Sequence, residues 1–258
     1  MEENHETIDE TEVILEEAEE ELEEQEEIEE VQMDDTPWIF FDYSGTLVDT
    51  VDALSRTYTK FLSRDFPPDQ VKSLYKDFPK MSKVALLRKY KFNPFKYLIV
   101  GKNKLEEIRK EEFWEGVRAF PGIPEVLMRL QKIVNAKLAI VTHETELLDP
   151  EERVKIFQRF GIPIQFNEVI ADSSNKEENF DLLVQNKGIA YGIIIGDNQF
   201  DIDLGKKHNF YTIGVTWGFS TRDEFTADYI IDDPQEILQV VMSLMHQIEQ
   251  KKLHGDPI

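Results

Sequence analysis

Short runs of Ile, Val and Phe recur along most of the chain, and segments of helical character separate them. A strand that is apolar on both faces must be covered on both faces, which is typical of a parallel sheet between two layers of helices. The sequence therefore predicts an α/β fold around a Rossmannoid parallel sheet. The expected strands are 38–41, 138–141, 166–170, 192–195, 211–215 and 229–231.

Residues 51–118 interrupt this alternation directly after the first strand. They look helical apart from one short strand candidate, Tyr97–Val100. We expect them to form a helical insert that lies over the sheet as a lid. The turn signal Phe120-Pro121-Gly122 marks the return to the core, and residues 234–253 are expected to form a helix with Pro234 in its first turn.

Polar side chains follow three of the expected strands directly, namely Asp42, Thr142 and Asp197. Taken singly, such a residue is more often a turn or helix-cap residue than a functional one. In open α/β sheets, however, ligands bind at the carboxyl ends of the strands. We therefore expect these three side chains to meet in one site.

The segments around these residues resemble the motifs of the haloacid dehalogenase superfamily, which consists mostly of magnesium-dependent phosphatases. Residues 42–47, Asp-Tyr-Ser-Gly-Thr-Leu, are similar to the nucleophile motif Asp-x-Asp-Gly-Thr-Leu. Thr142 matches the hydroxyl motif, and residues 196–201 match the acidic motif Gly-Asp-x-x-x-Asp. Lys176 matches the motif lysine, although Glu177 stands where that motif has Pro; Lys187 is a weaker candidate.

The resemblance covers residues 37–50 and 119–233, and segments 120–122 and 214–218 look especially like the phosphoglycolate phosphatase branch. It implies a core of residues 36–50 and 119–258, a helical cap of residues 51–118 inserted after the first strand, and a separate N-terminal tail of residues 1–35.

The resemblance also implies the chemistry of the site. Asp42 would attack phosphorus and form an aspartyl phosphate. A Mg²⁺ ion would be held by Asp42, Asp197, Asp201 and the main-chain carbonyl of Ser44. Thr142 and Lys176 would hold the phosphoryl oxygens. The implied function is therefore phosphoryl hydrolysis of a small phosphorylated metabolite.

Ser44 departs from this pattern, because the superfamily's phosphatases have a second Asp there that acts as general acid and base. A serine hydroxyl cannot do this near pH 7, and losing such help costs about 10²- to 10⁴-fold in rate. The first interpretation is a phosphatase that is slow or selective for good leaving groups. The second is a C–P hydrolase similar to phosphonoacetaldehyde hydrolase, with Lys83 as its Schiff-base lysine. The third is a non-catalytic, phosphate-binding regulatory protein.

His143, directly after Thr142, is a candidate substrate contact. It is a less favoured replacement for the missing acid, since adjacent residues at a strand end point in different directions.

Charge is distributed unevenly along the chain. Residues 1–35 contain 19 acidic residues and no Lys or Arg, which favours a disordered tail over a coiled coil built on Ile8, Leu15 and Leu22. Residues 51–118 contain 16 basic and 9 acidic residues, a balance that suits an anionic substrate. Lys80, Lys83 and Arg88 are the candidate contacts. The tail is expected to bind the basic insert or a basic partner.

Other partner classes find little support in the sequence. A nucleic-acid partner is not favoured, because no recognition motif accompanies the basic residues. No apolar run reaches the roughly 18 residues of a membrane span, and the N-terminus does not resemble a signal peptide. Cysteine is absent, so disulfides and thiolate metal sites are excluded. A cytoplasmic protein is expected, and the oligomeric state is left open.

Overall fold

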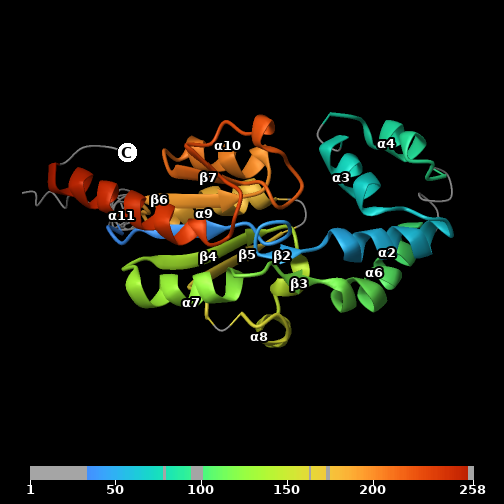
Figure 1. Ribbon diagram of the computed structural model, residues 1–258, viewed down its shortest axis with the longest axis horizontal. Coiled ribbons are helices and arrows are strands. Elements are labelled where there is room, and N and C mark those ends of the chain that lie inside the picture. The colour runs from blue at the N-terminus through green and yellow to red at the C-terminus, as the bar shows by residue number, and fades with distance from the viewer. Residues whose placement is uncertain (1–33, 78–79, 94–100, 163, 173–174, 255–258) are drawn as a thin grey trace, which may run out of the picture. The chain divides into compact units, whose positions relative to one another are not determined.

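A parallel sheet of six strands forms the centre of the computed structural model, which describes residues 34–77, 80–93, 101–162, 164–172 and 175–254 (Figure 1). Its strands are β1 (Trp38–Phe41), β4 (Lys137–Thr142), β5 (Glu168–Ala171), β6 (Gly192–Gly196), β7 (Tyr211–Val215) and β8 (Tyr229–Ile231). Their order in the sheet is β5-β4-β1-β6-β7-β8, and every pairing is parallel. The predicted α/β fold is confirmed.

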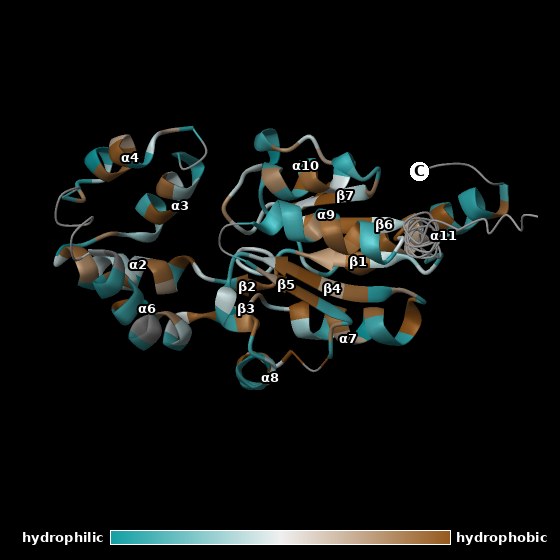
Figure 2. Ribbon diagram, turned by 180° about the vertical axis from the view of Figure 1, so that it is seen from behind, coloured by the Kyte–Doolittle hydropathy of each residue, from teal (hydrophilic) through white to brown (hydrophobic). Residues whose placement is uncertain are grey.

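Strand β1 lies at the centre and is buried on both faces, as its unbroken apolar sequence predicts. Successive side chains of a strand point to opposite faces. Ile39 and Phe41 accordingly belong to one hydrophobic cluster, and Trp38 and Phe40 to another. The hydrophobic colouring of the central strands in Figure 2 reflects this burial.

Two layers of helices cover the sheet. The helices are α7 (Ile123–Ile133), α8 (Pro150–Arg159), α9 (Lys176–Asn186), α10 (Gln199–Lys207) and α11 (Glu236–His254), and two short 3₁₀ turns are η2 (Thr145–Leu147) and η3 (Arg222–Glu224). Apolar residues of α7, α8 and α11 join the cluster that contains Ile39, whereas those of α9 and α10 join the cluster that contains Phe40. Figure 1 shows α7 and α10 on opposite sides of the sheet.

The helical insert lies between two short antiparallel strands, β2 (Val48–Asp49) and β3 (Arg118–Ala119). Its described helices are α2 (Val51–Leu62), α3 (Pro68–Asp77), α4 (Lys83–Lys89) and α6 (Lys102–Gly116). The sequence did not predict the β2–β3 pair, because two residues are too few to show a periodicity. Residues 33–258 form one compact unit, and the predicted division into core and cap stays a prediction.

Two elements begin two residues later than expected. Strand β5 begins at Glu168 rather than Phe166, because the Asn167 side chain accepts the N–H of Leu138 (2.9 Å) in place of a ladder bond. Helix α11 begins at Glu236 rather than Pro234, because Asp233 forms a tight turn before it. In this turn the Asp233 carbonyl accepts the N–H of Glu236, and the Asp233 carboxylate accepts the N–H of Gln235.

Some predictions lie outside the described residues, namely the strand candidate Tyr97–Val100, the seam through Ile8, Leu15 and Leu22, and almost all of the acidic tail. Among the helices of the described segments, none has the length and apolar character needed to cross a membrane.

Candidate active site

Asp42 lies immediately beyond the end of β1, at the carboxyl edge of the sheet. Its N–H donates to the carbonyl of Ile195 (2.9 Å), so the residue continues the pairing of β1 with β6. Its side chain is buried and accepts a hydrogen bond from Lys176, with 2.7 Å between Nζ and Oδ1. The hydrogen bond to β6 therefore fixes the main chain of Asp42, and the hydrogen bond from Lys176 fixes its side chain.

Lys176, the first residue of α9, connects two acidic side chains. Its Nζ donates to Asp42 and also to Oδ1 of Asp201 (2.8 Å), and only 2% of its side chain is exposed. Burial acts to lower the pKa of Lys176, but Asp201 and Asp42 outweigh it, and the pKa is raised. The lysine therefore stays charged. The alternative, Lys187, pairs instead with Glu168 (2.9 Å).

Asp42, Asp197 and Asp201 form what we call the carboxylate cluster. Each offers an oxygen, and these three oxygens lie within 4.8 Å of one another. Burial raises the pKa of Asp197 well above its ordinary value, and the charges of Asp42 and Asp201 raise it further. Burial also raises the pKa of Asp42 against the opposing effect of Lys176, and raises that of Asp201 to about 6.

The carboxylate cluster fits a hard divalent cation. Its three carboxylates face one lysine within the described residues, which leaves negative charge uncompensated in a buried place. Oδ2 of Asp201 is buried and has no hydrogen-bond partner in the described part of the chain. Carboxylate oxygens are preferred ligands of Mg²⁺.

Two glycines make room for Asp197, which follows β6. Gly45 has φ +87°, and a Cβ there would lie 2.1 Å from Oδ2 of Asp197. A Cβ on Gly218 would lie 2.2 Å from the same atom. Oδ2 also accepts the N–H of Phe219 (2.7 Å), so the segment after β7 holds this carboxylate in place.

Thr142 and His143 continue the edge of the sheet from β4. Thr142 is buried, and its Oγ1 accepts the N–H of Glu144 (3.2 Å), which leaves its own hydroxyl hydrogen available to donate. His143 is exposed, and its Nδ1 lies 2.9 Å from the carbonyl oxygen of Asp172. Together with Lys176 it lines an open hollow of about 430 Å³. The partial loss of solvent around the ring, followed by the charge of Lys176, lowers the pKa of His143.

Ser44 makes a contact that sequence reasoning missed. Its Oγ donates to Oε1 of Glu144 (3.0 Å), and the other oxygen of Glu144 forms an ion pair with Arg109 of α6. Only 12% of the Glu144 side chain is exposed. Burial raises the pKa of Glu144, and Arg109 opposes this. The available signal was a charged residue two positions beyond Thr142; the partner Arg109 could not be found from local pattern.

Lys83 does not join these residues. It is exposed at the first position of α4, and in both ribbon views α3 lies between α4 and the sheet (Figures 1 and 2). The structure therefore brings together Asp42, Lys176, Asp197 and Asp201, places Ser44 beside Glu144, and leaves Lys83 apart.

The helical insert also contacts the segment that holds Asp197. Nζ of Lys72 donates to the carbonyl of Gly218 (3.0 Å), and the ring of Tyr75 stacks on that of Phe219 with centroids 4.6 Å apart. These are contacts of α3, so α3 and α6 reach two different parts of the site.

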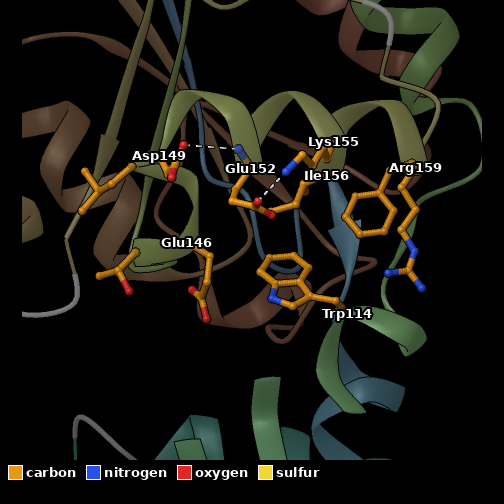
Figure 3. Close-up of a pocket in the computed structure, with 10 residues that line it drawn as sticks. Trp114, Glu146, Asp149, Glu152, Lys155, Ile156 and Arg159 are labelled. Atoms are coloured by element: carbon orange, nitrogen blue, oxygen red, sulfur yellow. Dashed lines mark hydrogen bonds and ion pairs between the residues drawn. The ribbon is translucent and has the colours of Figure 1, made fainter. Parts of the chain in front are cut away.

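A second hollow, of about 480 Å³, lies between the end of α6 and helix α8 (Figure 3). Trp114 faces Ile156 and the ion pair of Glu152 with Lys155 across it. No member of the carboxylate cluster lines this hollow. It is therefore separate from the site at the strand ends.

The chain is similar to known proteins over most of its length. The family model described as haloacid dehalogenase-like hydrolase matches residues 39–215. A phosphoglycolate phosphatase of Synechococcus elongatus is 25% identical over 81% of this chain and 99% of its own length. The pyrophosphatase PpaX of Oceanobacillus iheyensis is 24% identical over 79% of this chain and 95% of its own. A crystal structure of a putative phosphatase from Clostridium difficile superposes with a TM-score of 0.64 at 20% identity, covering 79% and 97% of the two chains.

Proposed function

Since the chain belongs to the family of haloacid dehalogenase-like hydrolases, as its motifs predict, we propose that it is a Mg²⁺-dependent phosphatase acting through an aspartyl phosphate on Asp42. One observation carries the proposal: Lys176 holds Asp42 inside a buried cluster of three carboxylates at the carboxyl edge of the sheet. A structural role alone gives no reason to bury three acids around one lysine, because burying unpaired charge is costly.

The residues divide the reaction among them. Lys176 holds one oxygen of Asp42, and the other oxygen attacks phosphorus while the bond to the leaving oxygen breaks. The Thr142 hydroxyl, whose hydrogen is free to donate, holds a phosphoryl oxygen. Asp42, Asp197, Asp201 and the main-chain carbonyl of Ser44 would hold a Mg²⁺ ion, which would supply positive charge to offset that of nucleophile and phosphate. Water then releases phosphate from Asp42.

The preferred substrate class is set at Ser44. Its hydroxyl donates to Glu144, so it does not donate to a leaving oxygen. Without a general acid, a leaving group must depart as a stable anion. We therefore propose small acyl phosphates and phosphoanhydrides as the preferred substrates. One of the relatives is named a pyrophosphatase, which supports the anhydride class.

The test is a phosphatase panel with leaving groups of graded pKa, assayed in Mg²⁺ and in EDTA. We expect turnover only with metal and a steep fall in kcat/KM as the leaving-group pKa rises. Asp42→Asn should abolish turnover and the acid-stable phosphoenzyme. Equal turnover in this variant would refute the proposed nucleophile, and metal-dependent phosphate binding without turnover on any substrate would support a regulatory protein instead.

The C–P hydrolase alternative gains no support from the position of Lys83. Borohydride trapping with phosphonoacetaldehyde tests it directly, and a covalent adduct on Lys83 would revive it.

A further inference from the structure

We propose that Glu144 is a positioning residue for Ser44, and that it turns the Ser44 oxygen into a hydrogen-bond acceptor for the water that attacks the phosphoenzyme. The inference rests on the proposed function, because it concerns the second half of that reaction. It assigns a role to Ser44, which stands where the motif has an Asp, and to Glu144, which belongs to none of the motifs.

Hydrogen-bond direction is the first step of the argument. The two oxygens of Glu144 face different donors, Oγ of Ser44 on one side and the guanidinium of Arg109 on the other. A guanidinium has donors only and remains charged in proteins. A carboxylate flanked in this way accepts at both oxygens. The Ser44 hydrogen therefore points to Glu144, and the Ser44 lone pairs point elsewhere.

The second step is the side on which Ser44 lies. Phe41 and Tyr43 both lie in the hydrophobic cluster that contains Ile39, so the alternation of β1 continues as far as Tyr43. Tyr43, between Asp42 and Ser44, is fully buried in the hydrophobic core, with its ring 6.3 Å from that of Phe157. Asp42 therefore points to the opposite side. Ser44 donates to Glu144, whose N–H donates to Thr142 at the end of β4, so Ser44 lies at the same edge of the sheet as Asp42.

The third step is that Glu144 is itself fixed. Arg109, which pairs with it, comes from α6, and the guanidinium carbon lies 4.6 Å from the centroid of the Phe113 ring. The main-chain N–H of Glu144 donates to Thr142 at the end of β4. Glu144 is thus held by the core through its backbone and by the insert through its side chain, so the Ser44 hydroxyl has one preferred orientation.

The chemistry assigned to Ser44 is orientation without proton transfer. In dephosphorylation, the water oxygen bonds to phosphorus, the bond from phosphorus to Asp42 breaks, and its electron pair returns to the carboxylate. Both hydrogens of the water stay on the phosphate, which leaves as dihydrogen phosphate. A hydrogen bond from the water to Ser44 aims the water at phosphorus. Phosphoryl transfer to Asp42 involves no such water, so only the second half of the reaction uses this contact.

A burst experiment separates the two halves. With p-nitrophenyl phosphate and Mg²⁺, nitrophenolate release reports phosphorylation of the enzyme, and acid-quenched phosphoenzyme reports its decay. We expect Ser44→Ala and Glu144→Ala to slow the decay by roughly tenfold, the value of one hydrogen bond, while the burst rate stays near that of the wild type. The double variant should be no slower than either single variant. The matched control is Glu146→Gln, since Glu146 also faces Arg109 (4.0 Å) but does not contact Ser44.

Glu144→Gln guards against a merely structural effect, because it keeps the shape of Glu144 but reverses this hydrogen bond. Arg109 has donors only and takes the amide oxygen, which leaves the amide nitrogen to donate to Ser44. We expect its decay to be as slow as that of Glu144→Ala, whereas a role in packing alone predicts recovery. The inference is overturned if burst and decay slow in parallel, if decay is unchanged, if Glu144→Gln decays as fast as the wild type, or if Glu146→Gln is as slow as Glu144→Ala. Failure of the proposed function gives a different result, since the wild type would then form no phosphoenzyme on Asp42.

Discussion

Replacing Asp201 with Asn should remove part of the loss of stability that the metal-free protein undergoes as pH rises from 4 to 7. The side chain of Asp201 is 1% exposed, and the pKa of its carboxyl rises from an ordinary value of 3.8 to about 6, chiefly through burial. Between these values the folded protein holds a proton that the unfolded chain releases. Proton binding by Asp201 therefore stabilises the folded state fully below pH 3.8, and this stabilisation is lost as pH rises through 6.

This pKa difference corresponds to about 3 kcal/mol at neutral pH. The asparagine remains neutral, so in EDTA at pH 7 the variant should be more stable than the wild type by up to about 3 kcal/mol, with little difference near pH 4. With saturating Mg²⁺ the order should reverse, because the wild type binds the ion with one more carboxylate and ligand binding stabilises the folded state.

Urea denaturation at pH 4 and pH 7, in EDTA and in Mg²⁺, measures all four stabilities. Asp203→Asn is the matched control, because Asp203 lies on the same helix but is exposed. The control should show neither the pH effect nor the metal effect. The reasoning is refuted if Asp201→Asn is less stable than the wild type at pH 7 in EDTA. It is also refuted if Mg²⁺ raises the free energy of unfolding of the variant as much as that of the wild type.

Two other substitutions test the site. Ser44→Asp combined with Glu144→Gln, which removes the like charge beside it, should raise kcat/KM for alkyl phosphates by about 10²-fold, and no gain in a folded, Mg²⁺-binding variant would contradict the interpretation of Ser44. Gly45→Ala should cost about 1–3 kcal/mol in urea and weaken Mg²⁺ binding measured by calorimetry, since its Cβ would strike Asp197. Gly161→Ala, at φ +67° with nothing within 4 Å, should cost less and leave Mg²⁺ binding intact.

The sheet could be predicted because its signal is local. Strands such as Trp38–Phe41 are buried on both faces, so every residue in them is apolar and the strand shows as an unbroken apolar run in the sequence. Asp42, Thr142 and Asp197 could be grouped because they lie at or just beyond the ends of three strands, and the carboxyl ends of parallel strands meet at one edge of the sheet. The predicted hydrolase family follows from these motifs and is confirmed by the family match.

The Glu144 contact could not be predicted, because it depends on side-chain direction and on a partner from the insert. Glu144 is polar and lies in a loop, so no periodicity marks it, and Ser44 is 100 positions away in the chain. Lys83 was chosen from its place in the insert alone, and the four described helices of the insert offer no strand edge to fix where its residues lie. The predicted roles of the site residues and of the acidic tail stay predictions.

Some basic residues of the insert contact the core, so they are not all available to attract an anionic substrate, as the sequence suggested. Lys72 donates to the carbonyl of Gly218, Lys76 pairs with Glu224 (3.0 Å), and Arg109 pairs with Glu144. Lys76 and Arg109 add little to the field that an approaching anion meets, because their carboxylate partners cancel much of their charge. The excess of positive charge in residues 51–118 therefore acts in part by holding α3 and α6 against the core. Since these contacts reach the segments that carry Phe219 and Glu144, the insert helps to position residues of the candidate site.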